Sequence, residues 1–475
     1  MTRRTSSRSG RPLVLAAGAL AALGLAGGPR AAHAQATPPA AAPASSATPM
    51  PGRIALERYQ LDNGLTVILA PDRSAQVVAV DVWYDVGSRD ERAGRTGFAH
   101  LFEHMMFQGS ANVKKGEHMN LISRAGGSMN GSTADDRTNY YETLPSNRLN
   151  LGLWLEADRM RSLAVTKENF ENQRETVKEE RRMRIDNQPY TGAFLSSLTS
   201  AFDAKSCFAY AHETIGSMDD LNAGTTDDVQ AFFKQYYAPN NATLVVTGDF
   251  DVADAKRTIQ SYFGGIPRAA AKPAVTCEQP FDVGQQRRTV TDAKATLPAV
   301  LALWRIPEYK GADTPALTFL ATILGQGESS RMNRSVVREA KAAVSAQTFA
   351  GLGPRRGPNV FAALAIANQG VRPDSLERLM LAEVARIASG GVTEAELAKA
   401  KNAYLAEQIN ERQRNLGRAE AIHTAHMFLG DPNAVNADLQ RYMTVTAADI
   451  QRVARKYLTD KNIVITLITP ETPKP

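Results

Sequence analysis

The sequence predicts an α+β protein made of two similar domains. The chain has 475 residues, which is longer than one hydrophobic core usually spans. Strand-like and helix-like segments alternate in both halves, and a stretch rich in Pro and Ala separates the halves. We therefore expect a first domain at residues 53–265, an interdomain linker at 266–285 and a second domain at 286–475.

The first half contains a clear hairpin signal and several apolar segments. Asn63-Gly64 lies between two β-rich runs, and Asn-Gly is a preferred hairpin turn. The other segments have the apolar period of a strand or of a helix. We expect strands at 77–86 and 242–249 and helices at 98–107, 149–161 and 167–186.

The second half repeats this order faintly. A strand, a loop and an apolar helix at 315–324 lead to a Gln-Gly pair at 326–327, as similar segments lead to the Gln-Gly pair at 108–109. This echo predicts a duplicated fold. No histidine lies within residues 213–422, so the second copy offers no imidazole on its corresponding helix.

The basic charge of the chain belongs to its N-terminus. The formal net charge is +6, but residues 1–34 hold five Arg and no acid, which leaves 50 basic and 49 acidic residues elsewhere. Lys and Arg do not cluster with aromatic residues in the remainder. We therefore predict no nucleic-acid partner.

The same N-terminal residues have the features of an export signal. An Arg-rich start precedes an apolar run at 13–26 and a small-residue site at Ala32-His33-Ala34. We expect a signal peptide at residues 1–34, cleaved near Ala34, and a periplasmic or secreted protein. The alternative, an uncleaved anchor, needs about 20 apolar residues, and the run is shorter. The composition of residues 35–52 predicts a disordered Pro/Ala linker.

The motif His100-Leu101-Phe102-Glu103-His104 is the central chemical feature of the sequence. Residues three and four apart share a helix face, so the two imidazoles and the carboxylate project together. Apolar flanks predict a buried helix, and burying these groups without a partner is costly. Two imidazoles at this spacing can bind one Zn²⁺, and Glu103 can activate a water molecule. The alternative is a chance match on a helix without metal.

A catalytic zinc also needs a third protein ligand and an open position. The acidic helix expected at 167–186 supplies candidates, and its apolar stripe is marked by Phe170 and Val177. Glu180 lies near that stripe, whereas the other glutamates of this helix are expected on a solvated face. Helical phase makes Glu180 the preferred carboxylate and does not exclude the others.

Together these motifs resemble the pitrilysin/insulinase-type zinc peptidases, which include the mitochondrial processing peptidases and their bacterial relatives. Glu180 follows His104 by 76 residues, which is the spacing of that family. Further matching segments extend the resemblance over roughly residues 54 to 470. They lie at 61–65, 87–91, 97–100, 130–133, 138–141, 215–216, 237–244, 248–249, 324–325 and 329–331.

The resemblance implies a fold, a metal and a way of binding substrate. It implies two similar domains, each an antiparallel sheet packed by helices, which form a clam-like peptidase chamber. It implies one Zn²⁺ per chain, held by His100, His104 and Glu180, with Glu103 as general base. An edge strand would pair with an extended peptide through its backbone. The residues implied for that strand are Asn130, Gly131, Ser132 and Thr133.

The chain departs from the family pattern at two places. Gln173 stands where relatives often have a second glutamate beside a zinc ligand, and such changes near a metal often cost about 10–100-fold in affinity or activity. In addition, residues 330–370 contain no convincing Arg/Tyr pair to hold the substrate carbonyl. A partner chain could supply that pair.

We therefore predict an exported zinc endopeptidase that cleaves short or unfolded peptides. One alternative is the metal-bearing subunit of a heteromeric peptidase that is inactive alone. Another is a non-catalytic structural relative. A homodimer, or a heterodimer with a paralogous subunit lacking the zinc motif, is expected.

The remaining reactive residues have simpler interpretations. His423 and His426 are expected to be ordinary helix residues, and His118 and His212 are expected to be structural or exposed. The sequence leaves open whether its two cysteines, Cys207 and Cys277, form a disulfide.

Overall fold

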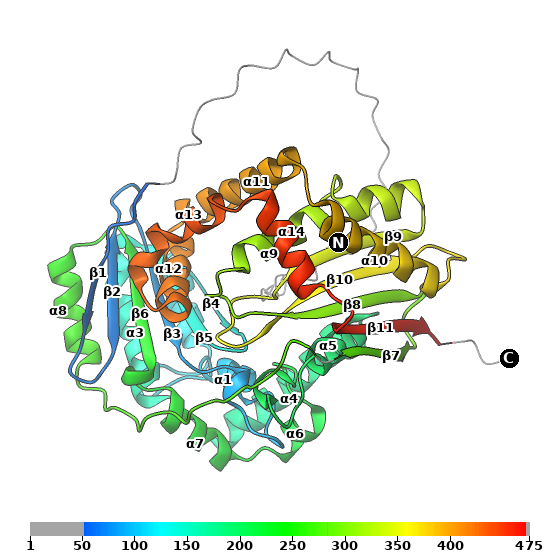
Figure 1. The fold of residues 1–475 in the computed structure, drawn as a ribbon. Helices are drawn as coiled ribbons and strands as arrows, with labels where there is room; N and C mark the ends of the chain where they lie inside the picture. The colour runs from blue at the N-terminus through cyan, green and yellow to red at the C-terminus, as the bar shows by residue number, and fades with distance from the viewer. Residues whose placement is uncertain (1–51, 283, 472–475) are drawn as a thin grey trace, which may run out of the picture. The chain divides into compact units, whose positions relative to one another are not determined.

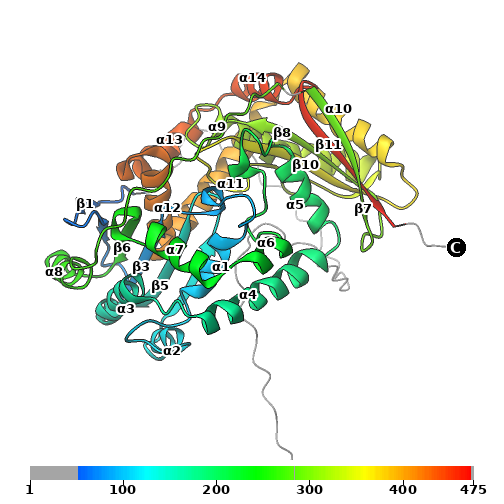
Figure 2. The ribbon, with the colours of Figure 1, turned by 90° about the horizontal axis from the view of Figure 1, so that it is seen from below.

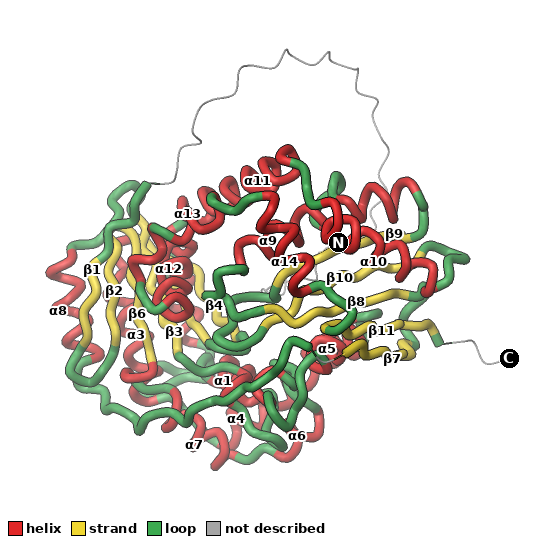
Figure 3. Tube along the Cα trace, viewed as in Figure 1, coloured by secondary structure: helices red, strands yellow, loops and turns green. Residues whose placement is uncertain are grey.

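The computed structural model describes residues 52–282 and 284–471. The predicted signal peptide and nearly all of the predicted linker at 35–52 lie outside the described residues. Among the helices in the described part, none has the length and hydropathy needed to cross a membrane. Figure 3 shows the strands gathered into two sheets with helices around them.

The first sheet has six strands in the order β1-β2-β6-β3-β5-β4 (Figure 1). The expected hairpin forms, because β1 and β2 pair in antiparallel register and Gly64 adopts a positive φ of 91° between them. β4 lies at the edge of the sheet and pairs with β5. The strands are β1 (Glu57–Gln60), β2 (Thr66–Pro71), β3 (Val77–Tyr84), β4 (Ser128–Thr133), β5 (Thr138–Pro145) and β6 (Ala242–Gly248).

The helices of the first half follow the expected segments and add shorter ones. The segment expected at 167–186 is an α-helix that continues as a π-helical turn, η3 (Arg182–Asp186). The α-helices are α1 (Phe98–Met105), α2 (Glu117–Arg124), α3 (Leu149–Ser162), α4 (Lys167–Arg181), α5 (Thr191–Ser200), α6 (Met218–Ala223), α7 (Thr226–Tyr236) and α8 (Val252–Phe263).

The second sheet has five strands in the order β7-β11-β8-β10-β9. The strands are β7 (Gly284–Asp292), β8 (Ala299–Ile306), β9 (Ala343–Ala350), β10 (Asn359–Ala367) and β11 (Asn462–Pro470). The α-helices are α9 (Thr314–Gly325), α10 (Pro373–Gly390), α11 (Glu394–Gln413), α12 (Asn415–Thr424), α13 (Asp438–Met443) and α14 (Ala447–Tyr457).

The two sheets have the same topology. Leaving out β1, the first order β2-β6-β3-β5-β4 corresponds strand for strand to β7-β11-β8-β10-β9. Both sheets also contain one parallel pair, β2 with β6 and β7 with β11, and are otherwise antiparallel. The expected α+β fold of two similar halves is confirmed. The expectation of purely antiparallel sheets is wrong for these two pairs, because the last strand of each half returns beside its first long strand.

Each sheet buries one face against helices of its own half and the other against a helix of the other half. Ala419 and Ile422 of α12 pack on Ile68 and Val245 of the first sheet. In the same way, α5 lies beside the second sheet (Figure 1), and its apolar side chains pack on that sheet. The domain boundaries expected from the sequence remain a prediction, and the apolar cores extend across them.

Candidate metal centre

Helix α1 carries the H-x-x-E-H motif on the first sheet. Its apolar side chains Leu101, Phe102 and Met105 are buried in the main core of that half. Gly97 begins the helix with a positive φ of 85°, which a glycine adopts at low cost. His100, Glu103 and His104 therefore project together from a helix that the core holds in place.

Helix α4 lies beside α1 and brings a carboxylate to the two imidazoles (Figure 2). Nε2 of His104 is 3.2 Å from Oε2 of Glu180, and Nε2 of His100 is 3.7 Å from the same oxygen. One candidate ligand atom from each of the three residues lies within 4.8 Å of the other two. Residues 76 positions apart in the chain thus converge on one point.

The apolar stripe of α4 explains why Glu180 points inward. Phe170, Gln173, Val177 and Glu180 are all buried, as the helical phase predicts. Thr166 begins the helix by accepting a hydrogen bond from the backbone N–H of Asn169. The exposed glutamates of α4 face away from this stripe.

The donor set and its unpaired atoms fit a zinc ion. Among the described residues, His104 Nε2 and His100 Nδ1 are buried without a hydrogen-bond partner. Buried polar atoms are normally paired, so an unpaired imidazole nitrogen facing a carboxylate is a costly arrangement. Two imidazole nitrogens and one carboxylate oxygen form the three-ligand set of catalytic zinc sites. His100, His104 and Glu180 could therefore hold the ion.

Electrostatics at the three candidate ligands favour an anionic carboxylate. Burial raises the pKa of Glu180, but the nearby His104, His100 and Arg184 outweigh it and lower the pKa to about 2. Nη1 of Arg184 forms an ion pair with Oε1 of Glu180 at 2.9 Å, and the other carboxylate oxygen, Oε2, is the one near the imidazoles. Burial, followed by repulsion from His104, lowers the pKa of His100 to about 4.

Glu103 lies on the same side of α1 and is held by β4. The Thr133 hydroxyl donates to Oε2 of Glu103 at 2.6 Å. Burial raises the pKa of Glu103, and the Thr133 hydrogen bond opposes that shift. Thr133 was expected to bind substrate, but its hydroxyl is hydrogen-bonded to Glu103, the predicted general base.

The backbone of β4 has a free edge beside Glu103. The N–H of Ala134 donates to the carbonyl of Arg137, so this is a hydrogen-bonded pair, and such pairs alternate along an antiparallel ladder. Met129, Gly131 and Thr133 therefore direct their N–H and C=O groups away from β5. A Cβ on Gly131 would lie 3.3 Å from Cγ of Glu103, which shows how closely this strand passes the motif.

The side chains of β4 alternate between two faces. Ser132 lies on the face opposite Glu103, where its hydroxyl donates to Asn139. Asn130 lies on that same face and is opposite Tyr141 of β5 in the strand register. The roles expected for Asn130, Gly131, Ser132 and Thr133 in substrate binding stay predictions, and the free backbone edge is the feature that could serve them.

Several polar neighbours complete the surroundings of the centre. Gln173 is buried on α4, and its side-chain amide donates to Oδ1 of Asn172 at 2.8 Å, so its expected role beside a zinc ligand stays a prediction. Arg184 was missed by the sequence reasoning, although its place four residues after Glu180 on one helix face was a usable signal. The sequence reasoning also assigned no role to Glu91, although Glu91 is the last residue of the family-like segment at 87–91.

His118, His423 and both cysteines have structural partners. His118 Nε2 lies 3.1 Å from Glu142, within a buried cluster that also contains Glu156 and Arg159. His423 is buried against the ring of Trp83, as expected for an ordinary helix residue. Cys207 and Cys277 form a disulfide, a pairing that the sequence leaves open.

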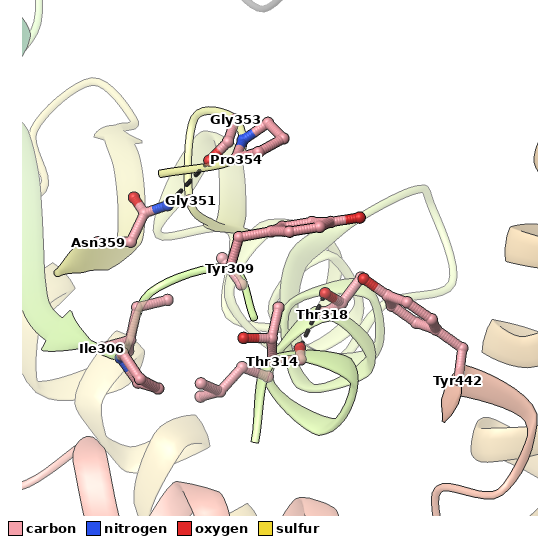
Figure 4. Close-up of a pocket in the computed structure, with 12 residues that line it drawn as sticks. Ile306, Tyr309, Thr314, Thr318, Gly351, Gly353, Pro354, Asn359 and Tyr442 are labelled. Atoms are coloured by element: carbon pink, nitrogen blue, oxygen red, sulfur yellow. Dashed lines mark hydrogen bonds between the residues drawn. The ribbon is translucent and has the colours of Figure 1, made fainter. Parts of the chain in front are cut away.

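The second half contains no counterpart of this centre within its described residues. When the two Gln-Gly pairs are matched, the residues of α9 that correspond to His100, Glu103 and His104 are Thr318, Ala321 and Thr322. Both threonines donate back to α9 carbonyls. Thr318 lines a pocket with Tyr309, Asn359 and Tyr442 (Figure 4), which offers no imidazole or carboxylate.

Comparison with known families places the fold and this centre in one class. Residues 66–205 match the family described as insulinase (peptidase family M16). Residues 224–404 match the domain described as the peptidase M16 inactive domain. The chain belongs to the M16 peptidase family, with the metal motif in the half that matches the first description.

Individual relatives are similar along most of the chain. The zinc protease PqqE of Helicobacter pylori is 29% identical over 417 residues, covering 87% of this chain and 93% of that protein. The crystal structure of a protease from Helicobacter pylori aligns with a TM-score of 0.83 at 28% identity, covering 88% of this chain and all of that one. A probable mitochondrial-processing peptidase subunit beta of Arabidopsis thaliana is 22% identical over 433 residues, covering 86% and 77%.

Proposed function

We propose that this protein is an exported zinc endopeptidase that cleaves short or unfolded peptides. The observation that carries the proposal is the convergence of His100, His104 and Glu180, with the unpaired buried Nε2 of His104 beside the carboxylate. One Zn²⁺ per chain would be held there. The zinc protease PqqE, similar over most of its length, supports the same assignment.

The residues of the centre divide the chemistry between them. When bound, Zn²⁺ would polarise the scissile carbonyl and make a nearby water more acidic. Glu103 takes a proton from the attacking water and delivers it to the leaving amine. The Thr133 hydroxyl holds one carboxylate oxygen of Glu103, which fixes the direction of the other.

The free edge of β4 supplies a binding site for extended peptide backbone. Its outward N–H and C=O groups can add a peptide as a further strand. Backbone pairing is independent of peptide sequence, but it needs an extended substrate, so a folded protein would not fit. This supports short or unfolded peptides as the substrate class.

The decisive test is cleavage of a quenched-fluorescent peptide pool by the zinc-loaded chain from Gln35 onward. We expect Glu103→Gln to reduce cleavage by about 100-fold or more, because general acid–base catalysis contributes about 10²–10⁴-fold. The same variant should keep one zinc per chain. Glu175→Gln, which removes an exposed carboxylate from α4, is the matched control and should retain activity.

Each outcome of this test has a distinct meaning. Wild-type cleavage that a chelator and Glu103→Gln both abolish would support a self-sufficient peptidase. Zinc binding without cleavage would favour a subunit that needs a partner. A chain that binds no zinc would overturn the assignment of the centre.

The partner-dependent alternative rests on one specific observation. Residues 330–370 contain no tyrosine, and their arginines nearest the first half are already paired. Arg355 pairs with Asp135, and Arg356 pairs with Asp85. A paralogue lacking the zinc motif would then complete the site, and mixing this chain with such a subunit would restore cleavage.

The proposed location outside the cytoplasm has independent support. Disulfides persist mainly in oxidising compartments, and Cys207 pairs with Cys277. We propose that the chain is cleaved near Ala34 and acts in the periplasm or outside the cell. N-terminal sequencing of the protein recovered from periplasm or medium would test this, and recovery of uncleaved chain in the cytoplasm would contradict it.

A further inference from the structure

Residues 207–217, which we call the bracket loop, contact both helices of the proposed metal centre. The loop leads from the region of α5 to α6. Its first residue, Cys207, is joined by the disulfide to Cys277, which anchors that end. Its later residues lie against the start of α1 and the end of α4.

The first contact of the bracket loop passes through Glu91 to the start of α1. Glu91 is buried and accepts hydrogen bonds from the backbone N–H groups of Gly97, at 2.8 Å, and Ala99, at 2.7 Å. A carboxylate in this position satisfies unpaired donors of the first helical turn and interacts well with the helix dipole. His212 lies 3.1 Å from the same carboxylate.

His212 itself is surrounded by acceptors. Its Nδ1 is 2.9 Å from the carbonyl oxygen of Phe208, and its Nε2 is 2.9 Å from that of Ser88. Because both ring nitrogens face only acceptors, the geometry suits a doubly protonated imidazolium. His212 and Glu91 then form a buried charge pair next to the N-terminal end of α1.

The bracket loop also touches α1 through backbone alone. A Cβ on Gly97 would lie 2.5 Å from the carbonyl oxygen of Ile215. A Cβ on Gly216 would lie 2.5 Å from Cα of Gly97. Glycine is therefore required at both positions for the loop to pass this close to the N-terminal end of α1.

The second contact reaches the end of α4. Arg181, which follows the candidate ligand Glu180, donates to the carbonyl oxygen of Gly216 at 2.7 Å. Arg181 also forms a salt bridge with Glu213 of the loop. Five consecutive residues of the loop, 212–216, therefore bind both the start of α1 and the end of α4.

We propose that the bracket loop sets the position of α1 relative to α4, with Glu91, His212 and Arg181 as positioning residues for the metal centre. This inference rests on the proposed function, because it assumes that His100, His104 and Glu180 bind zinc together. None of the three positioning residues belongs to the proposed ligand set. Breaking the bracket would leave the ligands intact and lose their alignment.

The test compares His212→Ala, Arg181→Ala and the double variant with the wild-type chain. Zinc affinity is measured by competition with a chelator, and ligand geometry by the visible absorption spectrum of the Co²⁺-loaded protein. We expect each single variant to weaken zinc binding about 10–100-fold, as changes around metal ligands usually do. The zinc affinity of the double variant should fall by less than the product of the two single-variant factors, because either substitution releases the same loop.

A matched control separates alignment from general loss of stability. His118→Ala also removes a buried histidine that contacts a glutamate, but it lies outside the bracket loop. It should leave zinc affinity and the Co²⁺ spectrum unchanged. In the metal-free protein, His212→Ala should speed amide hydrogen exchange at both α1 and α4, and His118→Ala should not.

The outcomes distinguish this inference from the proposed function. A wild-type chain that binds no zinc would remove both. If the wild type binds zinc, and His212→Ala and Arg181→Ala bind it with the same affinity as the wild type, the bracket inference alone would be overturned. Equal weakening by His118→Ala would also overturn it, because the effect would then reflect stability alone.

Discussion

At the scale of single residues, the start of α1 depends on Gly97. Its φ of 85° costs a residue with a side chain about 1–3 kcal/mol, and a Cβ would also collide with Ile215. We expect Gly97→Ala to lower the free energy of unfolding by more than that conformational cost, measured by urea denaturation of the metal-free protein.

Gly94 provides the control for that prediction. It has a similar φ of 80°, but a Cβ there would meet no atom within 4 Å. Gly94→Ala should therefore show the conformational cost without the collision. If the two variants were equally unstable, the close approach of the bracket loop to α1 would not matter for folding.

The residues of the proposed centre were readable from the sequence to different degrees. His100, Glu103 and His104 follow from helical spacing within five residues. Glu180 required the phase of a second helix, and the structure brings it to the two imidazoles as that phase favoured. Their role as metal ligands and general base stays a prediction, because it depends on a bound ion.

At the scale of elements, the edge strand β4 makes a prediction about substrates. In an added strand, every second backbone N–H of the peptide faces β4. Methylating those N–H groups one at a time should lower kcat/KM by about fivefold at alternating positions, since a hydrogen bond contributes about 1 kcal/mol. A series of N-methylated peptides would show this period of two, and a flat profile would exclude pairing through β4.

The start of α11 is a second element with a testable property, because its contribution to the free energy of unfolding should depend on pH. Glu396 completes a capping box with Thr393 and accepts two hydrogen bonds from Arg331, each at 2.8 Å. The Arg331 hydrogen bonds lower the pKa of Glu396 to about 2. Because the folded pKa lies below the unfolded value of about 4.3, this stabilisation is present above that value and is lost as pH falls toward 2.

The matching experiment compares urea unfolding of Glu396→Gln and the wild type. The variant should be less stable at pH 7, and the difference should shrink between pH 4.5 and pH 2. Glu394→Gln, an exposed acid in the same helical turn, is the control and should show a smaller difference at pH 7. A constant difference across this range would rule out the Arg331 pair as its source.

At the scale of the whole molecule, the two halves depend on each other for their cores. α12 covers one face of the first sheet, and α5 covers one face of the second. We expect residues 53–265 expressed alone to be insoluble or unfolded, because an apolar sheet face would be exposed. Co-expression with residues 266–475 should restore soluble protein, as judged by co-purification and circular dichroism. A stable, folded 53–265 fragment would contradict this dependence.

The sequence by itself determined the local features of this protein. Strand and helix periods, the Asn63-Gly64 turn, the H-x-x-E-H spacing and the two-part organisation are short-range patterns, and the physics that produces them acts within a few residues. The faint echo between the halves was also visible, and the shared strand order now explains it.

Only the tertiary structure decided what depends on contacts between distant segments. It placed α5 and α12 each on the sheet of the other half, made β2 parallel to β6 and β7 parallel to β11, and joined Cys207 to Cys277. It also showed that Glu91, His212 and Arg181 connect the two helices of the metal centre. These contacts join residues far apart in the chain, and no local period or turn preference records which distant partner a buried side chain meets.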